Sequence, residues 1–150
     1  MQLPAFPFVV LDTETTGLIP KVNRVIEFAS VRYDGKNESK PYEQLFSIPG
    51  TIPEQVITLT HITDDDLKGC LSFEEKRAEV LEAIGEDTVI IGQNVSFDIQ
   101  MLKGEGIDLT DRPWIDTSMI ASLVFPELES YSLGYVNKVL DLNHEPVHRA

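Results

Sequence analysis

Apolar residues form short runs in the first third of the chain. One run, Phe8–Leu11, ends at Asp12, a second occupies 25–33 and is closed by Asp34-Gly35, and a third spans 42–48 between two prolines. Apolar runs of this length, bounded by turn residues, are typical of strands. Because the connections between them are short, we expect the three strands to form an antiparallel meander.

The pattern changes to helical spacing after residue 72. Ser72 and Glu75 have the spacing of a capping box, and the apolar positions that follow keep a helical period up to Gly85. The later segments predict a buried strand at 88–91, a helix capped by Ser96, a helix over 117–125 and a last helix over 132–140. A meander followed by strands that alternate with helices predicts an α/β fold, with a mixed sheet flanked by helices.

The composition is that of one ordinary globular domain with a strong acidic excess. The chain has 150 residues, of which 12 are basic and 25 acidic, so its formal net charge is −13. We expect a single domain over 1–150. The only cysteine, Cys70, excludes an intramolecular disulfide framework, and neither a signal peptide nor a membrane span is predicted. A cytoplasmic protein is therefore expected, and its acidity argues against broad electrostatic attraction to nucleic acid or lipid.

The strongest chemical signal is the acidic pair that follows the first strand. Asp12 and Glu14 are two residues apart, so in a strand their side chains share one face. Two carboxylates on one face repel each other unless a cation lies between them, and an all-oxygen ligand set suits Mg²⁺ or Mn²⁺ better than zinc. On spacing alone, it remains equally open that Asp12 simply ends the strand and caps the next turn.

A second acidic residue follows the strand predicted at 88–91. Asn94-Val95-Ser96-Phe97-Asp98 comes directly after that strand, and parallel strands present their carboxyl ends at a common edge where ligands bind. Asp98 would lie one turn into a helix and face the Asp12/Glu14 pair. The alternative is a solvent-facing aspartate in a first helical turn, where the helix dipole favours it.

The end of the chain contains a formal zinc-protease pattern. His144-Glu145-Pro146-Val147-His148 matches H-E-x-x-H, which needs both histidines on one continuous helix. Pro146 would interrupt that helix, and proline is more typical of a first helical turn. We therefore expect Pro146 to begin a helix and reject the zinc site.

Taken together, these segments resemble the DnaQ-like 3′–5′ exonucleases of the DEDD class with a catalytic histidine, which have the ribonuclease H-like fold. The first motif of that family is similar to the segment 12–18 (DTETTGL), the second to 94–98 (NVSFD), and the opening of the third to 148–150 (HRA). A loop motif of the family resembles Thr60-His61-Ile62-Thr63, with His61 where the family has glycine. Arg24 and Glu27, and further on Asp116-Thr117, also fall where the family tends to have them.

The resemblance implies a two-metal mechanism of phosphodiester hydrolysis at a 3′ end. Asp12, Glu14 and Asp98 would bind Mg²⁺ or Mn²⁺, and His148 would be the general base for the attacking water. The same resemblance implies that Leu18 and Ile62 pack on the terminal base and that Asn94 helps to position the strand, and it adds Thr15 and Phe97 to the substrate-binding set. The implied partners are a single-stranded or frayed DNA 3′ end, or RNA, and a polymerase or helicase.

One departure from the family bears on activity. The final aspartate of the third motif belongs about five residues after His148, beyond Ala150, so we expect the chain as given to be cut within that motif and to have little turnover. The competing interpretation is a nuclease-like module that binds without cleaving. The presence of Asp12, Glu14, Asp98 and His148 together favours the exonuclease.

Overall fold

A five-stranded mixed sheet forms the centre of the protein in the computed structural model, which describes residues 6–142. The strands are β1 (Phe8–Thr15), β2 (Val25–Tyr33), β3 (Tyr42–Leu45), β4 (Val89–Gly92) and β5 (Trp114–Asp116), in the spatial order β3-β2-β1-β4-β5. β1, β2 and β3 pair antiparallel, whereas β4 runs parallel to both β1 and β5. The predicted α/β fold, a meander followed by parallel strands, is confirmed.

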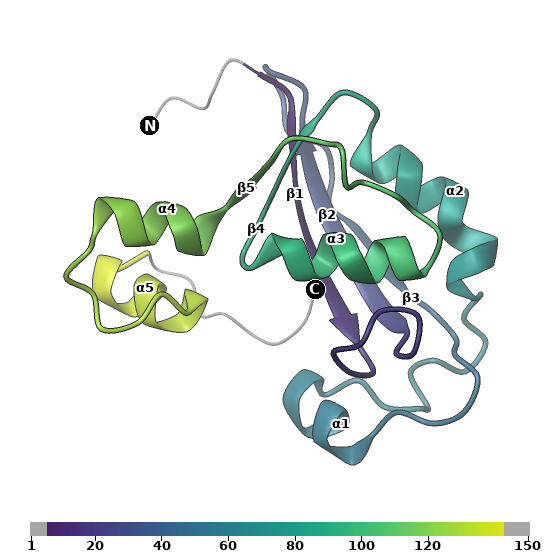
Figure 1. Cartoon of the computed structure of the whole chain (residues 1–150). Helices are drawn as coiled ribbons and strands as arrows, with labels where there is room; N and C mark the ends of the chain where they lie inside the picture. The colour runs from purple at the N-terminus through teal and green to yellow at the C-terminus, as the bar shows by residue number, and fades with distance from the viewer. Residues whose placement is uncertain (1–5, 143–150) are drawn as a thin grey trace.

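Helices lie against the sheet and around its ends. They are α1 (Glu54–Thr60), α2 (Phe73–Ile84), α3 (Val95–Gly104), α4 (Thr117–Val124) and α5 (Leu133–Leu140). Figure 1 shows α2 and α3 packed along the sheet, α1 near the end toward which β1 points, and α4 and α5 together beyond β5. Within residues 6–142, no helix is long and apolar enough to span a membrane.

The side chains of β1 alternate between two environments. Val9, Leu11 and Thr13 are buried, whereas Val10 and Asp12 are exposed and Glu14 is half-buried. The buried side faces the helices, because Val9 and Leu11 share one core cluster with apolar residues of α2 and α3; that cluster includes Phe73, Val80, Ile84, Ile99, Met101 and Leu102. The acidic pair therefore lies on the face of the sheet opposite to α2 and α3.

Three local predictions differ from the structure. The third strand ends at Leu45 rather than Ile48, and neither α1 nor the short strand β5 has a counterpart with stated bounds among the predicted elements. The predicted cap at Ser96 is wrong, because α3 already begins at Val95 and its N-cap is Asn94 in the left-handed region, with φ 54°. Asparagine tolerates that conformation, so the backbone turn rather than a serine side chain begins this helix. The capping box of Ser72 and Glu75 is confirmed.

His61 ends α1 in a conformation that favours glycine. It is the C-cap of the helix with φ 59°, and its backbone N–H donates to the carbonyl of Ile57 at 2.8 Å. A left-handed residue is the usual end of a helix, and glycine takes that conformation without the steric cost of a Cβ. The family's glycine at this position is thus explained by backbone geometry, and histidine keeps the same turn at a cost.

We predict that His61→Gly raises the free energy of unfolding by about 0.5–1 kcal/mol, because it removes the left-handed strain. Thermal melting should then show a midpoint roughly 2–4 °C higher for a chain of this size. Gln55→Gly, at an exposed position of the same helix, is the matched control and should lower the midpoint. Equal losses of stability in the two variants would contradict the role given to His61.

Candidate active site

The acidic pair of β1 lies at the carboxyl end of the central strand. Asp12 is opposite Ala29 on β2, and Glu14 is opposite Glu27, which is only 4% exposed. Directly opposite residues of antiparallel strands share a face, so three acidic side chains are gathered on the side of the sheet away from α2 and α3. Such a concentration of carboxylates is favourable to a cation.

Asp98 reaches the same strand from the first turn of α3. It is 3% exposed, and its Oδ1 accepts a hydrogen bond of 2.6 Å from the hydroxyl of Thr13. Burial raises the pKa of Asp98 to about 7; the hydrogen bond from Thr13 lowers it, and the negative charge of Asp12 raises it further. Asp98 is therefore close enough to Asp12 for their charges to interact, while its carboxylate is bonded to Thr13.

The turn that begins α3 is held by a second buried carboxylate. Asp116, at the end of β5, accepts hydrogen bonds from the backbone N–H of Asn94 at 3.1 Å and from the N–H and hydroxyl of Ser118 at 2.8 and 2.6 Å. Burial raises the pKa of Asp116, but these donors outweigh it and the pKa lies below the ordinary value. Asp116 is thus a stable anion that fixes the Asn94 turn.

An ion pair fixes the other end of α3. Arg24 donates through Nε and Nη2 to the two carboxylate oxygens of Glu105 at 2.7 and 2.8 Å, and Glu105 also accepts from the backbone N–H of Val25 at 3.1 Å. Bidentate pairs of this kind have strict geometry. Because Glu105 directly follows α3 and Arg24 precedes β2, the pair sets where α3 lies relative to the sheet, and with it Asp98.

The donor set fits a divalent cation, although the complete metal site stays a prediction. Carboxylates of Asp12, Glu14 and Asp98 offer only oxygen ligands, and Asp98 is buried beside a like charge, which a cation would relieve. Within residues 6–142, however, no group of three or more carboxylate, histidine or cysteine side chains is arranged to hold a metal ion. In this arrangement Asp98 is directed to Thr13.

The predicted substrate contacts divide between exposed and buried positions. Leu18 is 79% exposed on the loop after β1, Asn94 is exposed, and Thr15 and Phe97 are half-buried. Ile62 is fully buried in a satellite core with Ile26, Ile52 and Leu67. The prediction that Ile62 packs on a base is therefore not supported, because a base cannot reach its side chain in this structure. The predicted general base, His148, lies outside the described residues, as does Pro146.

Sequence reasoning missed residues that position the acidic side chains. Thr13 lies between the two acids of the motif, so strand alternation directs it to the opposite face, toward α3. Glu105 stands between Gly104 and Gly106, at the end of a helix where glycines are expected but an acid is not. The helix dipole disfavours an acidic residue at the C-terminal end of a helix, so its presence there indicates a cationic side chain from another segment as its partner.

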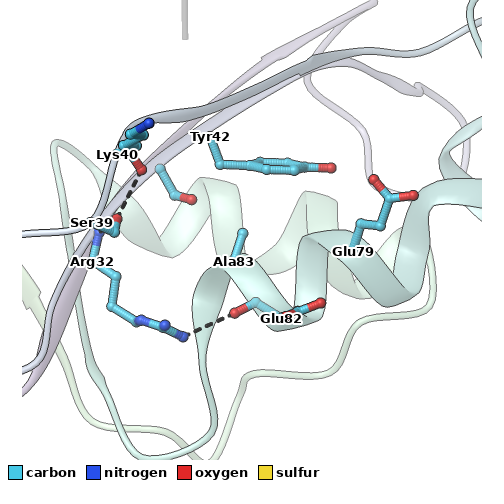
Figure 2. A pocket seen from close by; sticks show the side chains of 8 residues that line it. Arg32, Ser39, Lys40, Tyr42, Glu79, Glu82 and Ala83 are labelled. Atoms are coloured by element: carbon cyan, nitrogen blue, oxygen red, sulfur yellow. Dashed lines mark hydrogen bonds between the residues drawn. The ribbon is translucent and has the colours of Figure 1, made fainter.

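A hollow at the edge of the sheet is separate from the acidic residues. It has a volume of about 300 Å³ and lies between β2, β3 and α2, where Arg32, Tyr42 and Glu79 line it, as Figure 2 shows. The Tyr42 hydroxyl is buried and has no hydrogen-bond partner among the described residues. Ser30, another lining residue, is opposite Leu11 of β1, so this hollow opens on the helix-covered face.

Comparison with known proteins places this chain in a family. The model of a family described as "Exonuclease", of the RNase T type, matches residues 9–150. The chain belongs to this exonuclease family. The match includes the carboxylates of β1 and the segment 94–98, so the acidic site described above lies within the part of the chain that defines the family.

Curated relatives are much longer than this chain. The "DNA polymerase III PolC-type" of Thermotoga maritima is 37% identical over 148 residues, which are 95% of this chain and 11% of that protein. The same protein of Pediococcus pentosaceus is 33% identical over 147 residues, 95% of this chain and 10% of the relative. "3′-5′ exonuclease DinG" of Bacillus subtilis is 30% identical over 148 residues, 95% of this chain and 16% of the relative. The chain thus spans only about a tenth to a sixth of the length of these relatives.

Solved structures support the fold. Exonuclease X in complex with 5′ overhanging duplex DNA superposes with a TM-score of 0.74 at 24% identity, covering 95% of this chain and 81% of that one. Exonuclease I of E. coli in complex with a dA16 oligonucleotide superposes with a TM-score of 0.81 at 20% identity, covering 97% of this chain and 37% of the other. The ribonuclease H-like arrangement that the motifs predicted is therefore confirmed.

The raised pKa of Asp98 predicts a pH-dependent stability. The folded value is about 7 against 3.8 for the ordinary group, so folding disfavours the anion, and the penalty grows as pH rises from about 4 to about 7. In the presence of a chelator, Asp98→Asn should raise the free energy of unfolding by up to about 4 kcal/mol at pH 8 and by much less at pH 4. Urea denaturation at both pH values measures the difference.

Asp116→Asn is the control for this experiment, because Asp116 is also a buried aspartate but has a lowered pKa. Its anion is favoured by folding, so this substitution should lower stability above pH 4. If Asp98→Asn stabilised the chain equally at pH 4 and pH 8, the perturbed titration of Asp98 would be refuted.

Proposed function

We propose that residues 1–150 form one exonuclease domain that hydrolyses phosphodiester bonds from the 3′ end of a nucleic acid with Mg²⁺ or Mn²⁺. The observation that supports this proposal most directly is the burial of Asp98 against the strand that carries Asp12 and Glu14. A nearly inaccessible carboxylate beside a like charge is costly to folding, and such perturbed groups concentrate at functional sites.

The residues of this chain would have separate roles in hydrolysis. Asp12, Glu14 and Asp98 would hold the cations, which when bound polarise the phosphate and stabilise negative charge on the attacking and leaving oxygens. Thr13 fixes the Asp98 carboxylate through a hydrogen bond of 2.6 Å, so that the carboxylate keeps one orientation. His148 would accept the proton of the attacking water, a role suited to a group that titrates near neutral pH.

The exposed loop after β1 supports a substrate with a free end. Leu18 presents an apolar side chain that is 79% exposed, three residues beyond the end of β1, and Asn94 is exposed where β4 leads into α3. Apolar and stacking contacts of this kind accept any base. We therefore propose a sequence-tolerant site for a single-stranded or frayed 3′ end of DNA, with RNA as a further substrate.

The family relationship also supports a setting within a larger enzyme. The relatives named above are a DNA polymerase and a protein called DinG, and in each the matched segment is a small part. With a net charge of −13, this chain has little general attraction for a polyanion. We propose that it acts in the cytoplasm beside a polymerase or helicase segment that supplies basic surface.

Asp12→Asn is the first test of the proposed function. In the natural full-length protein with Mg²⁺ or Mn²⁺, the substitution should lower the rate of 3′ nucleotide release by about 100-fold or more, because a metal ligand is lost. Folding should be intact or improved, since one of two neighbouring like charges is removed. The measurement is the shortening of a 5′-labelled single strand, with circular dichroism melting of both proteins.

Asp111→Asn provides the control, because it removes the same charge from an exposed turn. A 3′ phosphate on the oligonucleotide should slow release, and a chelator should stop it. Cleavage of a circular single strand would rule out an exonuclease. A protein that binds the 3′ end but releases no nucleotide with either metal would support the alternative, a binding module without catalysis.

A further inference from the structure

A second pocket of the molecule concentrates positive charge beside the loop that follows β1. It has a volume of about 340 Å³ and lies between that loop, the first turns of α2 and the end of α3; its lining includes Lys21, Arg24, Arg77, Glu74 and Glu105. Three cationic side chains therefore face two carboxylates. This local excess of positive charge is notable in a chain whose formal net charge is −13.

The backbone is shaped to bring the cations into this pocket. Lys21 is in the left-handed region with φ 68°, a conformation that is unfavourable for a residue with a Cβ and that is found preferentially at functional sites. A Cβ on Gly104 would lie 2.8 Å from the nitrogen of Lys21, so glycine is needed for the loop to approach α3. The loop is further fixed by Asn23, whose Oδ1 accepts from the N–H of Ile19 at 2.9 Å.

Arg77 is positioned in a comparable way from α2. Its Nε donates to the carbonyl of Glu105 at 3.1 Å, which directs the guanidinium across the end of α3. A Cβ on Gly106 would lie 3.1 Å from the guanidinium carbon, so glycine again makes room. Arg24 is already paired with Glu105, which leaves Lys21 and Arg77 as the cations that can serve a ligand.

We propose that this pocket binds a backbone phosphate of a nucleic acid outside the bond that is cleaved. The inference rests on the proposed function, because the loop that carries Lys21 also carries Leu18, the exposed residue expected at the terminal base. One phosphodiester carries one negative charge, which matches the excess of one positive charge in the pocket. Lysine and arginine are the side chains that bind phosphate, the first as a point charge and the second with its planar fork.

Lys21→Gln is the decisive variant, and Lys36→Gln, which removes the same charge from an exposed turn, is its control. Both are made in the Asp12→Asn background of the full-length protein, and binding of labelled DNA is measured by fluorescence anisotropy between 50 and 200 mM salt, roughly the range where phosphate contacts are sensitive. Lys21→Gln should raise Kd about three- to tenfold at low salt and reduce the slope of log Kd against log salt by roughly 0.7, whereas Lys36→Gln should change neither.

Two further variants keep the test independent of folding and strain. Lys21→Arg should bind like the parent, because charge is retained in the same backbone conformation. Arg77→Gln should weaken binding as Lys21→Gln does. Because Arg77 also contacts Glu105, the melting temperature of the Arg77→Gln variant is measured as well. If that variant fails to fold, Lys21→Gln alone decides the outcome.

The form of DNA identifies which strand supplies the phosphate. A loss of affinity for a single strand assigns the pocket to the cleaved strand, whereas a loss confined to a duplex with a short 3′ overhang assigns it to the complementary strand. Unchanged affinity for both forms, relative to Lys36→Gln, overturns the proposal while leaving the exonuclease intact. Conversely, if binding depends on Lys21 but the protein with Asp12 intact releases no nucleotide with Mg²⁺ or Mn²⁺, the pocket would be retained and the proposed function overturned.

Discussion

The structure depends on β1, a strand whose two faces meet different surroundings. β1 is the central strand, paired with β2 on one side and β4 on the other, so its backbone is fixed by neighbours along its length. Strict alternation then commits Val9, Leu11 and Thr13 to the helices and Asp12 and Glu14 to the opposite face. A shift of one residue would bury the two acids in an apolar core, so the hydrophobic effect that holds the sheet also fixes where the acids lie.

Two buried carboxylates, Asp98 and Asp116, differ in how strongly folding favours their charged form. Each accepts from a neighbouring hydroxyl, and burial is the largest influence on both pKa values. For Asp98 burial prevails and the negative charge of Asp12 adds to it, whereas for Asp116 the hydrogen bonds outweigh burial. The pKa values of these two carboxylates are thus displaced in opposite directions, because Asp98 is the more deeply buried of the two. The Asp116 anion holds the turn that begins α3, whereas the charge of Asp98 is disfavoured and a cation would relieve it. The Arg24–Glu105 pair fixes the far end of α3 and, with it, the place of Asp98.

The sequence predicts the sheet better than it predicts the turns. Strand alternation and apolar runs depend on neighbours close in sequence, so the meander, the later parallel strands and the shared face of Asp12 and Glu14 could all be predicted. The entry to α3 could not, because the N–H of Asn94 is satisfied by Asp116, which lies twenty-two positions away. The burial of Ile62 and the partnership of Arg24 with Glu105 likewise depend on contacts between distant segments, which no local pattern contains.

Under the proposed function this acidic chain acts on a polyanion, so its attraction has to be confined to a few places. Uniform basic surface would bind nucleic acid everywhere and with equal strength along the strand, which favours retention over movement. Here the attractive features are local: a group of carboxylates suited to divalent cations, and a pocket in which Lys21 and Arg77 are placed by the two glycines at the end of α3. The negative charge of the remaining surface then opposes binding in any other register. On this argument the net charge of −13 is compatible with the proposed nuclease, because it would restrict where a strand binds without preventing binding.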